Sequence, residues 1–182
     1  QTQGSAAGLA SAGDAGARTQ FADGARWHVS GDTLYSRLCS DAYALGGMFR
    51  GVQQAWIADG GVALCEISVG SGVRDGRGAW AVHPAVLDSC LHAMIAAAGG
   101  ELLAAGASDL APDNGDGRSF GAVVPRRIER IVFGGGAVGG RVWAVGRPDG
   151  VEVFNDAGEL VVRIEGFEAQ QLVERADAGG ST

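Results

Sequence analysis

The segment HPAVLDSCLHAMIAAAG, residues 83–99, constrains the fold of this chain more than any other feature. Pro84 suits the first turn of a helix, where its missing N–H costs no hydrogen bond, and the glycines that begin at Gly99 suit a helix end. Apolar residues recur at helical spacing at Leu87, Leu91, Met94 and Ile95. Because the helix is apolar on more than one side, we expect it to be buried.

Segments typical of strands lie on both sides of this helix. Before it come a short helix within residues 31–43, with Asp32 as its N-cap, and then two strands. After it come three or four strands, with a hairpin turn at NDAGEL between the last two. The predicted strands cover residues 49–58, 62–69, 121–133, 140–146, 151–155 and 160–172. Helices and strands do not alternate as in βαβ units, so the order predicts an α+β fold with an antiparallel sheet wrapped around one central helix.

The remaining segments predict loops and tails. Residues 1–25 are rich in Gly, Ala and Ser without periodicity, which is typical of a flexible linker. Residues 70–78 and 107–119 are Gly-rich and polar and predict loops. We therefore expect a linker at 1–25, one domain at 26–173 and a flexible tail at 174–182.

Charge and composition exclude several classes of function. The formal net charge is −7, which argues against a nucleic-acid-binding protein. Arg126 and Arg127, with Arg130 nearby, are the densest basic cluster and are interpreted as a solvated strand end rather than a phosphate site. The sequence contains no lysine, so Schiff-base chemistry and a P-loop lysine are excluded.

The cysteines and the apolar segments indicate the compartment. Cys39, Cys65 and Cys90 are odd in number and widely spaced, so neither a disulfide framework nor a zinc site fits, and we expect them to pack as small hydrophobic residues. The sequence shows no signal peptide and no apolar run long enough to span a bilayer. These features favour a reduced, cytoplasmic setting without membrane contact.

Asp88 and His92 are the candidate functional pair. Positions i and i+4 of a helix lie one above the other, so both side chains should project from the same face of the predicted buried helix. Burial would raise the pKa of the carboxyl and let it donate a proton near neutral pH, with His92 holding the carboxyl or sharing the proton. Spacing alone favours a plain helical contact, so that alternative stays open. His83 is interpreted as a helix-entry residue or cap, and His28 as a surface residue.

The stretch HPAVLDSCLHAM resembles the Asp motif of polyketide synthase dehydratase domains, in which His-Pro is followed by an apolar pair, the catalytic Asp, and a Gln or His four residues later. Upstream, Tyr43, Gly46, Phe49 and Gly51 match a Gly-Tyr-x-Tyr-Gly-Pro-x-Phe motif and the residues after it. Leu45 and Gly47 replace its usual second Tyr and Pro. Downstream, VVPRRIERIVF resembles the family strand that begins Leu-Pro or Val-Pro, although Arg126 and Arg127 depart from it. The resemblance covers roughly residues 27–172.

The resemblance implies one half, the C-terminal one, of a double hotdog fold. It implies that Asp88 protonates the departing hydroxyl of a β-hydroxyacyl thioester, with His92 as its partner. The substrate would arrive on the phosphopantetheine of an acyl carrier protein, without a metal or a tightly bound cofactor. The expected substrate contacts are Tyr43, Gly46, Phe49, Leu87, Leu91 and Pro125. Expected protein partners are the carrier protein, other polyketide synthase domains or an N-terminal hotdog half, and a homodimer or pseudo-dimer arrangement.

The family's base does not occur in this sequence. That base is a His in the pattern His-x-x-x-Gly-x-x-x-x-Pro, which none of His28, His83 and His92 matches. The base could belong to another chain or segment, the chain could pair with a second hotdog, or the domain could have lost dehydration and act as a double-bond isomerase, a cyclase or a scaffold. A thioesterase-type single hotdog, which also uses an acidic residue on its central helix, is a third reading.

Overall fold

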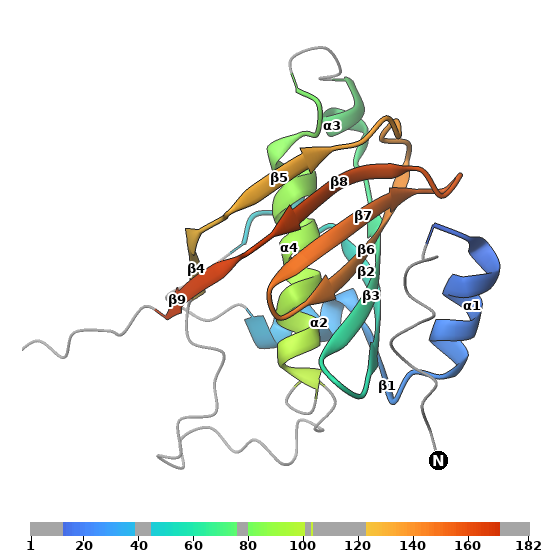
Figure 1. Ribbon diagram of the computed structural model, residues 1–182, viewed down its shortest axis with the longest axis vertical. Coiled ribbons are helices and arrows are strands. Elements are labelled where there is room, and N and C mark those ends of the chain that lie inside the picture. Colours follow the sequence, from blue (N-terminus) through green and yellow to red (C-terminus); the bar gives the residue numbers. More distant parts are fainter. Residues whose placement is uncertain (1–12, 39–44, 76–79, 101–102, 104–122, 172–182) are drawn as a thin grey trace, which may run out of the picture.

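The computed structural model describes residues 13–38, 45–75, 80–100, 103 and 123–171 (Figure 1). Three helices and three strands precede the central helix α4, which spans Pro84–Ala98, and six strands follow it. The elements before α4 are α1 (Ala15–Asp23), β1 (Trp27–Ser30), α2 (Gly31–Leu38), the 3₁₀ turn η2 (Gly47–Phe49), β2 (Val52–Ala58), β3 (Val62–Ser68) and α3 (Ser71–Asp75). The strands after α4 are β4 (Val123–Arg127), β5 (Arg130–Phe133), β6 (Arg141–Arg147), β7 (Gly150–Asn155), β8 (Leu160–Glu165) and β9 (Glu168–Gln171).

Seven strands form one antiparallel sheet in the order β1-β2-β3-β6-β7-β8-β5, and β4 pairs with β9 in a separate ribbon. Figure 1 shows α4 running along the inner face of this sheet. Inward-facing residues such as Val142, Ala144 and Val153 are fully buried beneath the helix. The predicted α+β architecture, an antiparallel sheet around one long helix, is confirmed.

Helix α4 begins and ends at the residues that its sequence predicted. The His83 side chain is the N-cap and accepts the Ala85 N–H at 3.2 Å, as expected for an entry residue, and Pro84 occupies the first turn. Gly99 caps the other end and donates its N–H to the carbonyl oxygen of Ile95. Strand β6 crosses α4 so closely at Gly146 that a Cβ there would collide with the helix backbone. Only glycine allows this packing distance.

Two segments predicted as single strands are each divided into two. Residues 121–133 become β4 and β5, and residues 160–172 become β8 and β9, with each pair split between the sheet and the ribbon. Gly166, at φ +63°, makes the second break, because this backbone conformation is accessible chiefly to glycine. The predicted hairpin between β7 and β8 is confirmed, with Gly158 at φ +84° in its turn.

Two local predictions differ from the structure. Residues 71–75 of the expected loop form α3. The first turn of α2 is capped by Ser30, whose Oγ accepts the Thr33 N–H at 3.2 Å, so Asp32 lies inside the helix and is not its N-cap. The expected loop at 107–119 and tail at 174–182 lie outside the described residues.

Helix α1 lies within the segment expected to be a linker, on the outer face of the sheet. Asp14 caps it by accepting the N–H groups of Gly16 and Ala17. The Arg18 guanidinium is buried 4.9 Å from the centre of the Trp143 ring on β6. The composition of residues 1–25 did not predict either contact, because each depends on a single polar side chain. Residues 1–12 of the same segment lie outside the described residues.

The basic cluster and two of the cysteines behave as predicted. Arg127 pairs with Glu129 and Glu168 on the exposed ribbon, which confirms a solvated strand end. Cys65 and Cys90 are fully buried as free thiols, and Cys39 lies outside the described residues. In the described part of the chain, no helix is long and apolar enough to cross a membrane.

Candidate active site

Asp88 and His92 project from the same face of α4, as their spacing predicted. Asp88 Oδ2 lies 3.7 Å from His92 Nε2. The imidazole is almost fully enclosed, with 5% of its side chain exposed, whereas the Asp88 side chain is 39% exposed. The pair therefore lies at the boundary of the core, with the histidine inside and the carboxyl reaching toward the surface.

Burial shifts the pKa values of both groups toward their neutral forms. Desolvation lowers the pKa of His92 from 6.5 to about 4 and raises the pKa of Asp88 above its usual value. His92 is consequently neutral at physiological pH, so its contact with Asp88 is not an ion pair. A neutral imidazole argues against a plain helical ion pair, and a role of the two residues in catalysis stays a prediction.

Asp88 Oδ2 is buried without a hydrogen-bond partner among the described residues. A buried oxygen in this state costs free energy, and such groups are uncommon in folded proteins. A carboxyl that is partly accessible and has one unsatisfied buried oxygen can hold a proton and pass it to a bound group. The arrangement suits a general acid.

Tyr35 on α2 supports His92 from the side away from Asp88. Its hydroxyl oxygen lies 3.3 Å from His92 Nδ1, and the two rings meet edge to face at 5.5 Å. The same oxygen accepts the Val52 N–H at 3.0 Å and lies 3.5 Å from the Phe49 carbonyl oxygen. Nothing in the sequence singled out Tyr35, since no spacing links it to a residue 57 positions away.

Ser89 attaches the turn before β2 to α4. Its Oγ accepts the Gly51 N–H at 3.2 Å and lies 2.9 Å from the Ala85 carbonyl oxygen. A Cβ on Gly51 would come within 2.7 Å of that Oγ, so glycine is needed at this approach. Sequence reasoning missed Ser89, although Gly51 at the end of the Tyr-Gly-Phe motif was an available signal.

The predicted substrate contacts are distributed around this pair. Phe49 is half-buried and directs its carbonyl toward Tyr35 and Ser89, which brings the motif segment to the site. Leu87 and Leu91 flank Asp88 along α4 and are half-buried. Gly46 is exposed before η2, Pro125 is exposed on β4, and Tyr43 lies outside the described residues. Substrate contact by these six residues stays a prediction.

His28 lies away from the site. It is exposed on β1, where its ring stacks on Trp56 at 5.2 Å and its Nε2 lies 2.7 Å from Gln54 Oε1. Its surface position is confirmed, and both contacts come from the neighbouring strand β2. In the described residues, no group of three or more His, Cys, Asp or Glu side chains could hold a metal ion.

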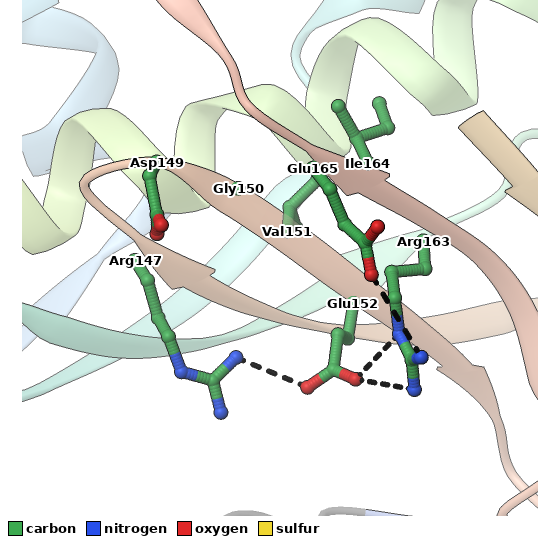
Figure 2. A pocket seen from close by; sticks show the side chains of 8 residues that line it. All are labelled: Arg147, Asp149, Gly150, Val151, Glu152, Arg163, Ile164 and Glu165. Carbon is green, nitrogen blue, oxygen red and sulfur yellow. Dashed lines mark hydrogen bonds and ion pairs between the residues drawn. The ribbon is translucent and has the colours of Figure 1, made fainter. Parts of the chain in front are cut away.

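A shallow groove on β7 and β8 is a second candidate site (Figure 2). Figure 2 shows Glu152 between two arginines, 3.0 Å from Arg147 and 2.8 Å from Arg163. Because Glu152 pairs with both arginines, neither offers a free positive charge to an anionic ligand. The groove lies on the sheet face opposite α4. The groove shows no arrangement for catalysis comparable with Asp88 and His92.

Comparison with known proteins identifies the family. The family model described as polyketide synthase dehydratase N-terminal domain matches residues 13–179. Polyketide synthase GfsB of Streptomyces halstedii is 35% identical over 68 residues, which are 37% of this chain and 1% of that protein. The spectinabilin polyketide synthase system protein NorB of Streptomyces orinoci is 41% identical over 59 residues, which are 32% of this chain and 3% of that protein.

Solved structures confirm the fold. The dehydratase domain from the CurK module of curacin polyketide synthase has a TM-score of 0.64 at 19% identity, covering 86% of this chain and 52% of that one. Inactive CurK variants with a His-to-Phe or an Asp-to-Asn substitution give TM-scores of 0.66 and 0.63 at 20% and 19% identity, with the same coverage. This chain thus spans about half the length of these dehydratase structures and adopts their hotdog fold. Its match to the family model over nearly its whole length shows that the chain belongs to the polyketide synthase dehydratase family.

Proposed function

We propose that this chain is the C-terminal hotdog half of a polyketide synthase dehydratase and supplies its acid, Asp88. The observation that carries the proposal is the buried, unpartnered Oδ2 of Asp88 beside a neutral His92. The Asp motif supports assignment to the C-terminal half, although the description of the matching family model refers to the N-terminal domain.

The proposed reaction is the loss of water from a β-hydroxyacyl thioester carried on an acyl carrier protein. A base removes the α proton, the electron pair forms the double bond, and the C–O bond breaks as Asp88 gives its proton to the departing hydroxyl. Desolvation of Asp88 supports this role because it favours the protonated carboxyl. The Asp-to-Asn variant of the CurK dehydratase is described as inactive, which supports an essential carboxyl in the family.

The base would come from a second hotdog. The His motif is missing from this sequence, and the His-to-Phe CurK variant is also described as inactive. Strand β5 is the last strand of the sheet, and its apolar residues Ile131, Val132 and Phe133 are 40%, 38% and 54% exposed. An exposed apolar edge strand is suited to pairing with another sheet. We propose an N-terminal hotdog half, or a second copy in a homodimer, as the partner on β5.

A dehydratase-like domain with another role is the second candidate. Leu45 and Gly47 replace the usual Tyr and Pro of the upstream motif, and this change favours a double-bond isomerase, a cyclase or a docking module. A buried carboxyl with a neutral histidine beside it argues against a pure docking role, because a scaffold needs no desolvated acid.

The test uses this chain together with its partner half and a β-hydroxyacyl carrier protein, followed by intact-protein mass spectrometry. We expect loss of water, and we expect Asp88→Asn to slow it by about 10²–10⁴-fold. Asp59→Asn is the matched control, since Asp59 is 73% exposed and pairs only with Arg26 among the described residues. Unchanged dehydration by Asp88→Asn would refute the acid role. With an enoyl carrier protein as the substrate, a shifted double bond seen by NMR of the released acyl chain would favour an isomerase. Hydrolysis of the thioester would favour a thioesterase.

A further inference from the structure

The hydroxyl of Tyr35 has three hydrogen-bond partners within 3.5 Å, and the Ser89 hydroxyl on α4 also interacts with it. Val52 N is 3.0 Å away, His92 Nδ1 is 3.3 Å away and the Phe49 carbonyl oxygen is 3.5 Å away. A phenol offers one proton and two acceptor positions. The Val52 N–H can only donate, so it takes one acceptor position. The Phe49 carbonyl can only accept, so it takes the proton.

This assignment leaves one acceptor position of Tyr35 facing His92 Nδ1. The contact is a hydrogen bond only when Nδ1 carries the proton of the neutral ring. Ser89 also lies 3.3 Å from the Phe49 carbonyl, but its single proton goes to the Ala85 carbonyl at 2.9 Å, which leaves Tyr35 as the donor to Phe49. If Tyr35 donated to His92 Nδ1 at 3.3 Å instead, the Phe49 carbonyl would have no donor from these side chains. With Nδ1 protonated, every one of these polar groups has a hydrogen-bond partner, and each donor bonds to a single acceptor.

The other ring nitrogen then faces Asp88 as an acceptor. A neutral histidine has one N–H, so a proton on Nδ1 leaves a lone pair on Nε2, 3.7 Å from Asp88 Oδ2. That oxygen is buried and has no other partner in the described part of the chain. At 3.7 Å the two atoms are too far apart for a hydrogen bond, but a lone pair facing Oδ2 disfavours the charged carboxylate, whereas the opposite tautomer would present an N–H and stabilise it.

We propose that Tyr35 is a positioning residue that holds His92 in its Nδ1–H tautomer, so that Nε2 faces Asp88 Oδ2 with a lone pair and does not stabilise the carboxylate. The proposal rests on the proposed role of Asp88 as the acid. It concerns Tyr35, which acts through His92 and does not itself touch the substrate.

The other titratable and charged groups around the pair leave this assignment in place. Burial raises the pKa of the Cys65 thiol on β3 to about 12 and raises that of Cys90 on α4, so both stay uncharged at neutral pH. The Arg50 guanidinium lies 5.8 Å from the centre of the Tyr35 ring, on the exposed side. Tyr35→Phe keeps the ring that Arg50 and His92 contact and removes the hydroxyl alone.

The first test reads the tautomer directly from ¹⁵N NMR of chain labelled at histidine, where protonated and unprotonated ring nitrogens differ in chemical shift. Comparison with His92→Gln assigns the His92 signals. We expect a protonated Nδ1 and an unprotonated Nε2 at neutral pH, and a shift toward Nε2–H in Tyr35→Phe. Ser36→Ala is the matched control, because Ser36 is an exposed residue on the same helix as Tyr35, its Oγ bonds the Thr33 carbonyl, and its removal should keep Nδ1–H.

The wild-type spectrum alone tests the tautomer assignment, so the proposal stays testable if Tyr35→Phe folds poorly. An Nε2–H tautomer in the wild type would overturn the proposal, as would an unchanged tautomer in a folded Tyr35→Phe. Because this readout needs no activity, a protein with Nδ1–H that fails to dehydrate would refute the proposed function and leave the tautomer assignment standing.

The second test is the pH profile of dehydration. The acid must be protonated, so activity falls as pH rises through the pKa of Asp88. In Tyr35→Phe the Nε2–H should favour the carboxylate and move this alkaline limb to lower pH by about one unit. A variant that is slower by the same factor at every pH would show a merely structural role for Tyr35 and would overturn the proposal.

Discussion

Replacement of His92 by Gln should remove a pH dependence from the stability of this protein. Burial lowers the pKa of His92 from 6.5 to about 4, so the unfolded chain binds a proton between these pH values that the folded chain excludes. Stability must therefore fall as pH falls through this window. At 1.36 kcal/mol per pH unit, the full loss is about 3 kcal/mol, complete near pH 4 and absent above pH 7.

The measurement is urea unfolding of the wild type and His92→Gln at several pH values from 4 to 7.5. Asp88 contributes with the opposite sign, since its raised pKa makes the folded state bind protons more tightly as pH falls. That contribution is present in both proteins and largely cancels in the difference between their free energies of unfolding. Gln keeps an amide that can contact both Tyr35 and Asp88, so it removes the titration with little loss of packing.

We expect the wild type to lose about 3 kcal/mol relative to His92→Gln between pH 7 and pH 4. A difference that stays constant within about 0.5 kcal/mol across this range would refute the account of a buried, neutral His92, because that change is within the effect of an ordinary surface substitution.

Three further predictions concern packing, reactivity and assembly. Gly146→Ala should destabilise the fold by about 3 kcal/mol in urea unfolding, because the added Cβ collides with the backbone of α4 at Ala93, and a change under about 0.5 kcal/mol would contradict this packing. Cys65 and Cys90 should resist thiol alkylation in the native state at neutral pH and react after unfolding, as read by peptide mass spectrometry, and labelling at the rate of a free exposed thiol would argue against their burial. Phe133→Glu should weaken association with the partner half in analytical ultracentrifugation while changing stability by less than about 0.5 kcal/mol, and unaltered association would argue against β5 as the interface.

The sequence predicted best the features that depend on residues close together in the chain. The apolar residues of α4, its Pro84 start and its Gly99 end predicted a buried helix with correct bounds, because helix periodicity and capping are set within a few residues. The alternation of β3 and the turn at Gly158 were predicted for the same reason. The common face of Asp88 and His92 followed from helix geometry alone.

The remaining features depend on contacts between distant segments. The division of residues 121–133 into β4 and β5 arises because their partners β9 and β8 lie in different sheets, which no local pattern encodes. The role of Tyr35 depends on a hydroxyl that reaches His92 from another helix. Helix α1 is capped by Asp14 and held on the sheet by Arg18, which contacts Trp143 and the Asp156 carbonyl, and by Phe21, within a composition typical of linkers.

The central claim is that Asp88 is a desolvated acid beside a neutral histidine, and its most direct test is a ¹³C NMR titration of side-chain carboxyl groups in chain labelled at aspartate. Comparison with Asp88→Asn assigns the Asp88 signal. Asp88 should titrate above the ordinary value of 3.8. A pKa for Asp88 at or below 3.8 would contradict the claim, because the carboxyl would then be an ordinary ionised group without a proton to give.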